Sequence, residues 1–123
     1  MSSGDLDRLA HLAKLLESAR LARFREVAAR ARAIDEKIAA LGNSGSGRDC
    51  NSDIQTLAQL AKWQLWQRGK ISRLQNERRT IAAEMEEARQ AARIALGRVE
   101  AINQIAIRET EVEKRLAERR AAL

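Results

Sequence analysis

The second half of the chain carries an apolar stripe that repeats every 3.5 residues. Fourteen positions alternate three and four residues apart without interruption, and eleven of them hold apolar side chains. A stripe of that period stays on one side of an α-helix only when the helix supercoils around a partner. The positions are Leu57, Leu60, Gln64, Gln67, Ile71, Leu74, Arg78, Ile81, Met85, Ala88, Ala92, Ala95, Val99 and Ile102. The sequence therefore predicts a long helix that packs along its length against another helix.

The composition favours helices over a compact mixed core. Phe24, Trp63 and Trp66 are the only aromatic residues, Tyr and Pro are absent, and 33% of the residues are charged. Ala, Glu, Arg, Leu and Gln are abundant, and these side chains lose little rotamer freedom on a helix. We therefore expect an all-α fold without strands, in a single domain over residues 1–123.

A segment rich in Gly, Ser and Asn separates two helical stretches. Residues 42–52 favour turns and a flexible connection, so we expect one helix over 5–41 and a second over 53–121. Both helices carry an apolar stripe, which we call the seam of the helix. A short connection between two such helices favours an antiparallel coiled-coil hairpin. In the first helix, the spacing of eleven residues from Leu16 to Val27 predicts a stutter in the heptad pattern.

The predicted hairpin also specifies which residues face each other. The predicted fold-back is centred near residue 47, and both helices rise by about 1.5 Å per residue. Residues that face each other should therefore have numbers that add up to about 94. That pairing places Phe24 near Ile71. Because the second helix is the longer one, roughly thirty C-terminal residues should overhang the first helix.

Positive charge gathers in two stretches. Residues 14–32 hold six basic and two acidic side chains, and residues 62–80 hold six basic and one acidic side chain. In the predicted hairpin these stretches would lie side by side and form a positive belt. Such a belt suits an acidic partner, whether a protein, a phosphate backbone or lipid headgroups. The simpler interpretation is a solvated polar face.

We expect neither catalysis nor a bound cofactor or metal ion. His11 is the only histidine and Cys50 the only cysteine, and no nucleophile with a base, carboxylate pair or metal cluster can be assembled on a two-helix rod. The N-terminal residues lack the features of a signal peptide, and no stretch approaches the roughly 20 apolar residues of a membrane span. The expected location is the cytoplasm, and a lone cysteine fits a reducing compartment.

Two groups of residues depart from the plain heptad pattern. The polar seam residues Gln64, Gln67 and Arg78 should fix the register of the helices at a cost in stability. Leu65 and Trp66 fall off the seam, where exposed tryptophan is typical of interaction surfaces. A third helix or self-association could equally cover them, and stacking of a nucleobase on Trp66 is a further alternative.

Several short motifs resemble a known family. They are Leu12, Leu16 and Arg20 in the first helix, then Trp63-Gln64-Leu65-Trp66, Lys70-Ile71-x-x-Leu74 and Ala92-Arg93-x-Ala95-x-Gly97-Arg98-Val99-x-Ala101. Together they are similar to the small coiled-coil stalk protein of the flagellar type III export apparatus, the FliJ-type family. The first helix is shorter than that family leads us to expect.

The resemblance implies a non-enzymatic stalk in bacterial flagellum biogenesis. It implies a cytoplasmic hairpin, peripherally associated with the membrane export apparatus, whose terminal end contacts the hexameric export ATPase. Its loop-side part would contact the membrane export gate protein, and export chaperones would be further partners. The implied ATPase contact comprises Ile102, Ile105, Arg108, Val112, Arg115 and Leu116, and the implied gate contact comprises Trp63, Leu65 and Trp66.

Two other classes of protein remain open at this point. A basic coiled-coil rod could bind nucleic acid through the positive belt, with an affinity that falls steeply with salt. A structural homo-oligomer could instead bury the overhang against a second copy of the chain.

Overall fold

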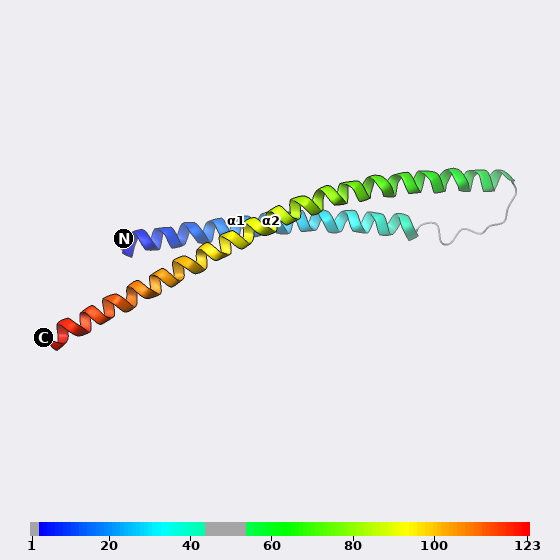
Figure 1. Ribbon diagram of the computed structural model, residues 1–123. Helices are drawn as coiled ribbons and strands as arrows, with labels where there is room; N and C mark the ends of the chain where they lie inside the picture. The colour runs from blue at the N-terminus through cyan, green and yellow to red at the C-terminus, as the bar shows by residue number, and fades with distance from the viewer. Residues whose placement is uncertain (1–2, 44–53) are drawn as a thin grey trace. The chain divides into compact units, whose positions relative to one another are not determined.

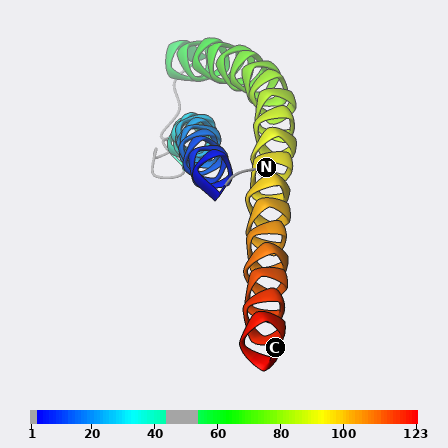
Figure 2. The same ribbon diagram turned by 90° about the vertical axis from the view of Figure 1, so that its left-hand side faces the viewer.

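The computed structural model describes residues 3–43 and 54–123, which form two helices. Helix α1 spans Ser3–Asn43 (41 residues) and helix α2 spans Ile54–Ala122 (69 residues). Both are continuous ribbons in two perpendicular views, and the described residues contain no strand (Figure 1 and Figure 2). The prediction of an all-α fold is confirmed. The expected connection lies largely outside the described residues, as does Cys50, although Gly42 and Asn43 still belong to α1.

The chain divides into two compact units, each made from part of α1 and part of α2. Unit 1 comprises Met1–Phe24 and Glu87–Leu123, and unit 2 comprises Arg25–Glu86. Each unit has its own buried side chains. Each is therefore described by itself.

Branched aliphatic side chains form the core of unit 2. Val27, Ala31 and Ile34 from α1 are buried together with Leu74 and Ile81 from α2. Burial of an aliphatic side chain of this size contributes about 1.5–3 kcal/mol. The half-buried side chains that pack against this core are Ile38, Leu41 and Met85. Unit 2 is thus held together by the predicted seams of both helices.

Small side chains dominate the buried positions of unit 1. Ala88, Ala92 and Ala95 of α2 are buried, with Val99 on the same helix and Leu6 on α1. Alanine adds little bulk between two helix backbones, so it permits a close approach.

The predicted seam of α2 matches the observed burial closely. Twelve of its fourteen positions are buried or half-buried, and the exceptions are Leu57 and Gln64, which are exposed. Near the start of the helix Trp63 is half-buried in place of Gln64. Periodicity alone therefore located the contact face of α2.

The N-terminal leucines of α1 do not all lie on its seam. Leu9 and Leu12 are 41% and 61% exposed, whereas Leu6 is buried and Ala10 and Ala13 are half-buried. The least exposed positions follow one heptad pattern on either side of Arg20, which is itself exposed while Leu16 and Leu21 are half-buried. Residues at seven-residue intervals or their multiples in this pattern are Leu6, Ala13, Val27, Ile34 and Leu41. Small residues, rather than the largest apolar ones, occupy the seam here, and leucines line its flank.

The predicted pairing of the helices is also wrong. The side chain of Arg78 forms an ion pair with Asp35 at 3.0 Å, and Arg30 forms one with Glu84 at 3.0 Å. The residue numbers of these pairs add up to 113 and 114, far from the expected value of about 94 that assumed equal rise on both sides of the fold-back. Phe24 accordingly lies beside Arg89 rather than near Ile71.

Gln67, a polar residue on the seam of α2, has a hydrogen-bond partner in the observed pairing. The side-chain nitrogen of Gln67 donates a hydrogen bond to the backbone carbonyl of Leu41, one of the last carbonyls of α1, which have no partner within the helix. In the expected pairing Gln67 would have faced Val27, which is fully buried among apolar side chains. A buried amide without a hydrogen-bond partner costs about 1–3 kcal/mol. The observed pairing avoids that cost.

The C-terminal overhang is shorter than predicted. Val99 is buried and Ile102 is half-buried, so this part of α2 is covered by α1. Toward the C-terminus, exposure becomes continuous only over residues 110–123, fourteen residues instead of the roughly thirty expected from the helix lengths. The first residues of α2, 54–59, are exposed as well. The length difference between the helices is therefore not all at the C-terminal end.

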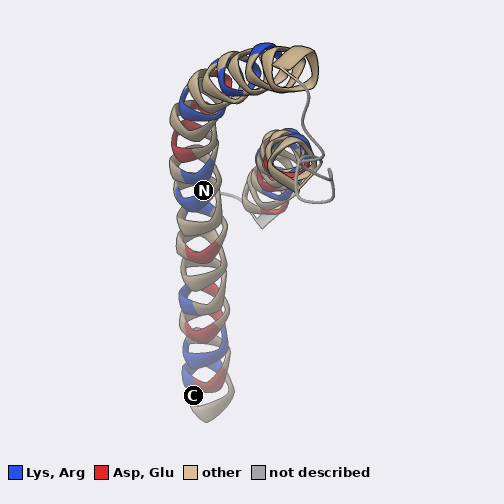
Figure 3. Cartoon of the chain, turned by 90° about the vertical axis from the view of Figure 1, so that its right-hand side faces the viewer, with Lys and Arg blue, Asp and Glu red and all other residues tan. Residues whose placement is uncertain are grey.

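The predicted positive belt is wrong for the same reason. In unit 2, Arg30 and Arg78 each face a carboxylate on the other helix instead of another basic stretch. Basic and acidic residues alternate along the C-terminal part of α2 (Figure 3). The altered pairing thus places positive charge beside negative charge.

Candidate partner-binding surfaces

The first turns of α2 expose apolar side chains in unit 2. Gln67 contacts the last turn of α1, so the residues before Gln67 lie beyond that turn. Among them Leu65 is 68% exposed and Trp66 is 56% exposed, whereas Trp63 is half-buried. We call the exposed set the α2 start surface; it comprises Ile54, Leu57, Leu65 and Trp66. The sequence placed Leu65 and Trp66 correctly off the seam.

Basic side chains surround the tryptophan of the α2 start surface. Lys62 and Lys70 are four residues before and after Trp66, so they lie one helical turn away on the same face. A large aromatic ring beside two ammonium groups favours a partner that offers both apolar contact and negative charge.

The last turns of α2 expose a second set of apolar side chains, in unit 1. Ile105, Val112 and Leu116 are 41%, 54% and 45% exposed. Arg108 and Arg115 are exposed between and beside them. We call these five residues the α2 tail surface. Arg108 and Val112 also line a shallow hollow of about 280 Å³ together with Glu109 and Glu113.

Ile102 does not belong to this tail surface. It is half-buried and lines a groove between the two helices of unit 1, with a volume of about 320 Å³. The other lining residues are Leu9, Leu12, Ala13, Leu16, Arg98 and Ala101. The six residues of the implied ATPase contact are thus divided: Ile102 lies in this groove, and the other five form the exposed α2 tail surface.

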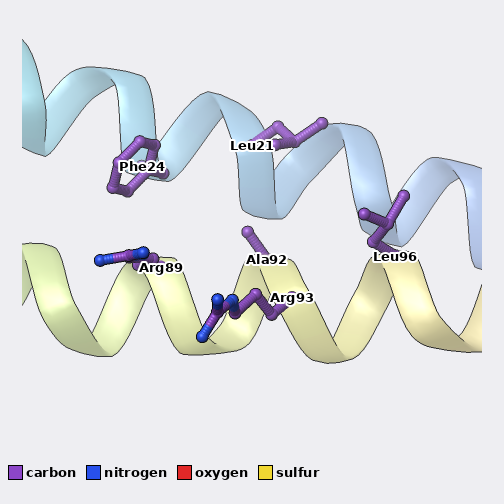
Figure 4. Close-up of a pocket in the computed structure, with 6 residues that line it drawn as sticks. All are labelled: Leu21, Phe24, Arg89, Ala92, Arg93 and Leu96. Atoms are coloured by element: carbon purple, nitrogen blue, oxygen red, sulfur yellow. The ribbon is translucent and has the colours of Figure 1, made fainter.

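A second groove of unit 1 has a volume of about 240 Å³ (Figure 4). Phe24 points from α1 toward α2, and Leu21 and Leu96 extend the apolar lining. Arg89 and Arg93 are the charged residues that line it. Neither groove was predicted from the sequence. The available signal was a leucine next to a seam alanine, as at Leu9 beside Ala10 and Leu12 beside Ala13.

Metal-binding clusters and membrane-spanning stretches are absent from the described residues. Within residues 3–43 and 54–123, no three His, Cys, Asp or Glu side chains come together in a way that could hold a metal ion. Neither described helix has an apolar stretch of the length needed to cross a membrane. The features that stand out are the two exposed surfaces and the two grooves.

The fold and these surfaces define a helical protein of two packed helices that leaves apolar side chains exposed at several places. Comparisons of the chain with protein-family models, with curated proteins and with solved structures find no match.

Proposed function

We propose that this protein is a non-enzymatic coiled-coil stalk of the flagellar type III protein export apparatus. In this proposal the two helices form an antiparallel coiled-coil hairpin. The α2 tail surface contacts the hexameric export ATPase, and the α2 start surface contacts the membrane export gate protein. The protein would act in the cytoplasm at the membrane-bound apparatus and would also engage export chaperones.

The hairpin is supported by the order of the contacts in unit 2. Moving toward the C-terminus of α1, from Arg30 to Asp35, the partner on α2 moves toward its N-terminus, from Glu84 to Arg78. Two helices whose contacts run in opposite order are antiparallel. The heptad spacing of the buried positions supports a coiled coil.

The main support for a linking role is apolar exposure at both ends of α2. Trp66 at one end and Val112 at the other are each more than half exposed. Exposed apolar groups of this size lower solubility, and they are characteristic of binding surfaces. The motif around the two tryptophans is what favours the FliJ-type stalk among proteins that link two partners.

Deletion of residues 110–123 tests the ATPase contact. These residues are exposed throughout, so their removal should leave the helicity of the remaining chain unchanged. We expect the deletion to abolish co-purification with the export ATPase of the same organism, because it removes Val112, Arg115 and Leu116.

A charge-neutral double variant controls for the shortened chain. Val112→Ser with Leu116→Ser should weaken ATPase binding by itself, whereas Ile94→Ser, at a residue 55% exposed elsewhere in unit 1, should not. Undiminished co-purification of the ATPase with the deletion variant would contradict the proposed contact.

A further inference from the structure

The first groove of unit 1 has an apolar lining and a single type of charge. Leu9, Leu12 and Leu16 form its α1 side, and Ala101 and Ile102 lie on α2. Arg98 is the only charged residue among those that line it. The groove therefore combines a hydrophobic floor with one guanidinium group.

Exposed aliphatic residues extend this groove along α2. Ile94, Ala101 and Ile105 follow one another at intervals of seven and four residues, which places them on one face of the helix. Ile94 is 55% exposed and Ile105 is 41% exposed. On α1, Leu9 and Leu12 are exposed to a similar degree. Two rows of aliphatic side chains with heptad-like spacing are the surface that a third helix packs against.

The charges near the groove decide between two kinds of helix. On α1, Arg20 follows Leu16 by four residues and so lies on the face of that groove residue; on α2, Arg108 follows Ile105 by three. Asp5 and Glu109 lie toward the ends; Asp5 already has an interaction of its own and Glu109 is half-buried. With Arg98, these charged residues comprise three arginines and two carboxylates, so positive charge is in excess beside the groove.

A second copy of this chain is a poor occupant. Each copy has a formal net charge of +6, and a symmetric contact through the groove would place two surfaces with the same excess of arginine against each other. Like charges placed opposite each other across an interface oppose association. A helix with acidic flanks instead places carboxylates beside these guanidinium groups, where charge-assisted hydrogen bonds form.

We propose that the first groove of unit 1 binds an acidic amphipathic helix of a partner protein and completes a three-helix bundle with it. The apolar face of the partner helix packs between Leu12 and Ile105, and its carboxylates pair with Arg98. This site adjoins the proposed ATPase contact and shares Ile105 with the α2 tail surface, but deletion of residues 110–123 leaves Ile105 and every residue of the groove lining in place, so the deletion distinguishes the two contacts.

Two synthetic peptides test this proposal with the full-length chain. Both contain three heptads with leucine on one face; one has glutamate on the flanks of that face and the other has lysine. We expect the glutamate peptide to bind, measured by fluorescence anisotropy, at least about tenfold more tightly than the lysine peptide. Arg98→Glu should reduce or reverse that preference.

Matched variants separate the groove from the general positive charge of the chain. Leu12→Ala should weaken binding of the glutamate peptide about tenfold, a loss typical of truncating an interface anchor. Ile107→Ala should leave binding unchanged, because Ile107 is 58% exposed, close to the 61% of Leu12, and does not line the groove. Circular dichroism should show the same helicity for both variants.

Three results would overturn the proposal. The two peptides could bind equally, or Leu12→Ala and Ile107→Ala could have the same effect. Sedimentation could instead reveal a dimer at micromolar concentration that Leu12→Ala dissociates, which would make a second copy the occupant.

Discussion

At the scale of single residues, two polar side chains on the α2 seam have specific partners. Gln67 donates to the carbonyl of Leu41 and Arg78 pairs with Asp35. The ion pair is partly exposed, with side-chain exposures of 30% for Arg78 and 54% for Asp35, and such pairs contribute about 0–1 kcal/mol. Their main effect is therefore on which residues pair, and less on overall stability.

Apolar burial is the larger energetic contribution at this scale. Val27 is fully buried in the core of unit 2. Val27→Ala removes two buried carbon atoms and leaves a cavity, so we expect the free energy of unfolding to fall by roughly 1–3 kcal/mol. Urea unfolding followed by circular dichroism measures this change. Leu116→Ala, at a residue 45% exposed, should change it by less than about 0.5 kcal/mol, and equal effects of the two substitutions would show that Val27 is not in the core.

At the scale of the elements, α2 contains two glycines that its packing does not require. A Cβ atom added at Gly69 or at Gly97 would meet no atom within 4 Å other than its own neighbours in the helix. The open space around both positions excludes a close contact between helices as the reason for glycine there.

Gly97→Ala should therefore stabilise the protein. Alanine restricts the unfolded chain more than glycine does and fits the helix without a clash, so we expect the free energy of unfolding to rise by about 1 kcal/mol. Thermal unfolding at 222 nm, by circular dichroism, measures the shift. The reciprocal substitution Ala83→Gly, at an exposed position in α2, should lower stability by a similar amount, and a destabilising Gly97→Ala would indicate that α2 is not helical there.

At the scale of the whole molecule, charge is balanced between the two units. Each unit contains three more basic than acidic residues, so the net charge of +6 is not concentrated in one belt. The interpretation of the chain as a nucleic-acid-binding rod relied on such a belt. That interpretation now lacks the feature that supported it.

Cross-linking tests the pairing of the helices in solution. In a Cys50→Ser background, Asp35→Cys with Arg78→Cys should react with a short bismaleimide to give an intramolecular cross-link, because the two native side chains are in contact. Asp35→Cys with Gln59→Cys represents the pairing predicted from the sequence and should not react in dilute solution. The opposite result, read from gel mobility and mass, would show that the helices pair with the offset predicted from the sequence.

Some properties of this protein are determined by the sequence alone. The helical fold, the break between two helices and the contact face of α2 all follow from local composition and periodicity, which act within a single helix. Leu65 and Trp66 were placed off the seam by the same reasoning. These features need no knowledge of the partner helix.

The tertiary structure decided how far the two helices are offset and, with it, everything that depends on neighbours. A heptad stripe still faces its partner after one helix slides by seven residues, so periodicity cannot fix the offset. In unit 2 the observed offset pairs Gln67 with the Leu41 carbonyl and Arg78 with Asp35; in unit 1 Val99 is buried and continuous exposure is limited to residues 110–123. The groove beside Leu12 exists for the same reason: leucines that lie off a seam of alanines become the wall of a binding surface only once the second helix lies beside them.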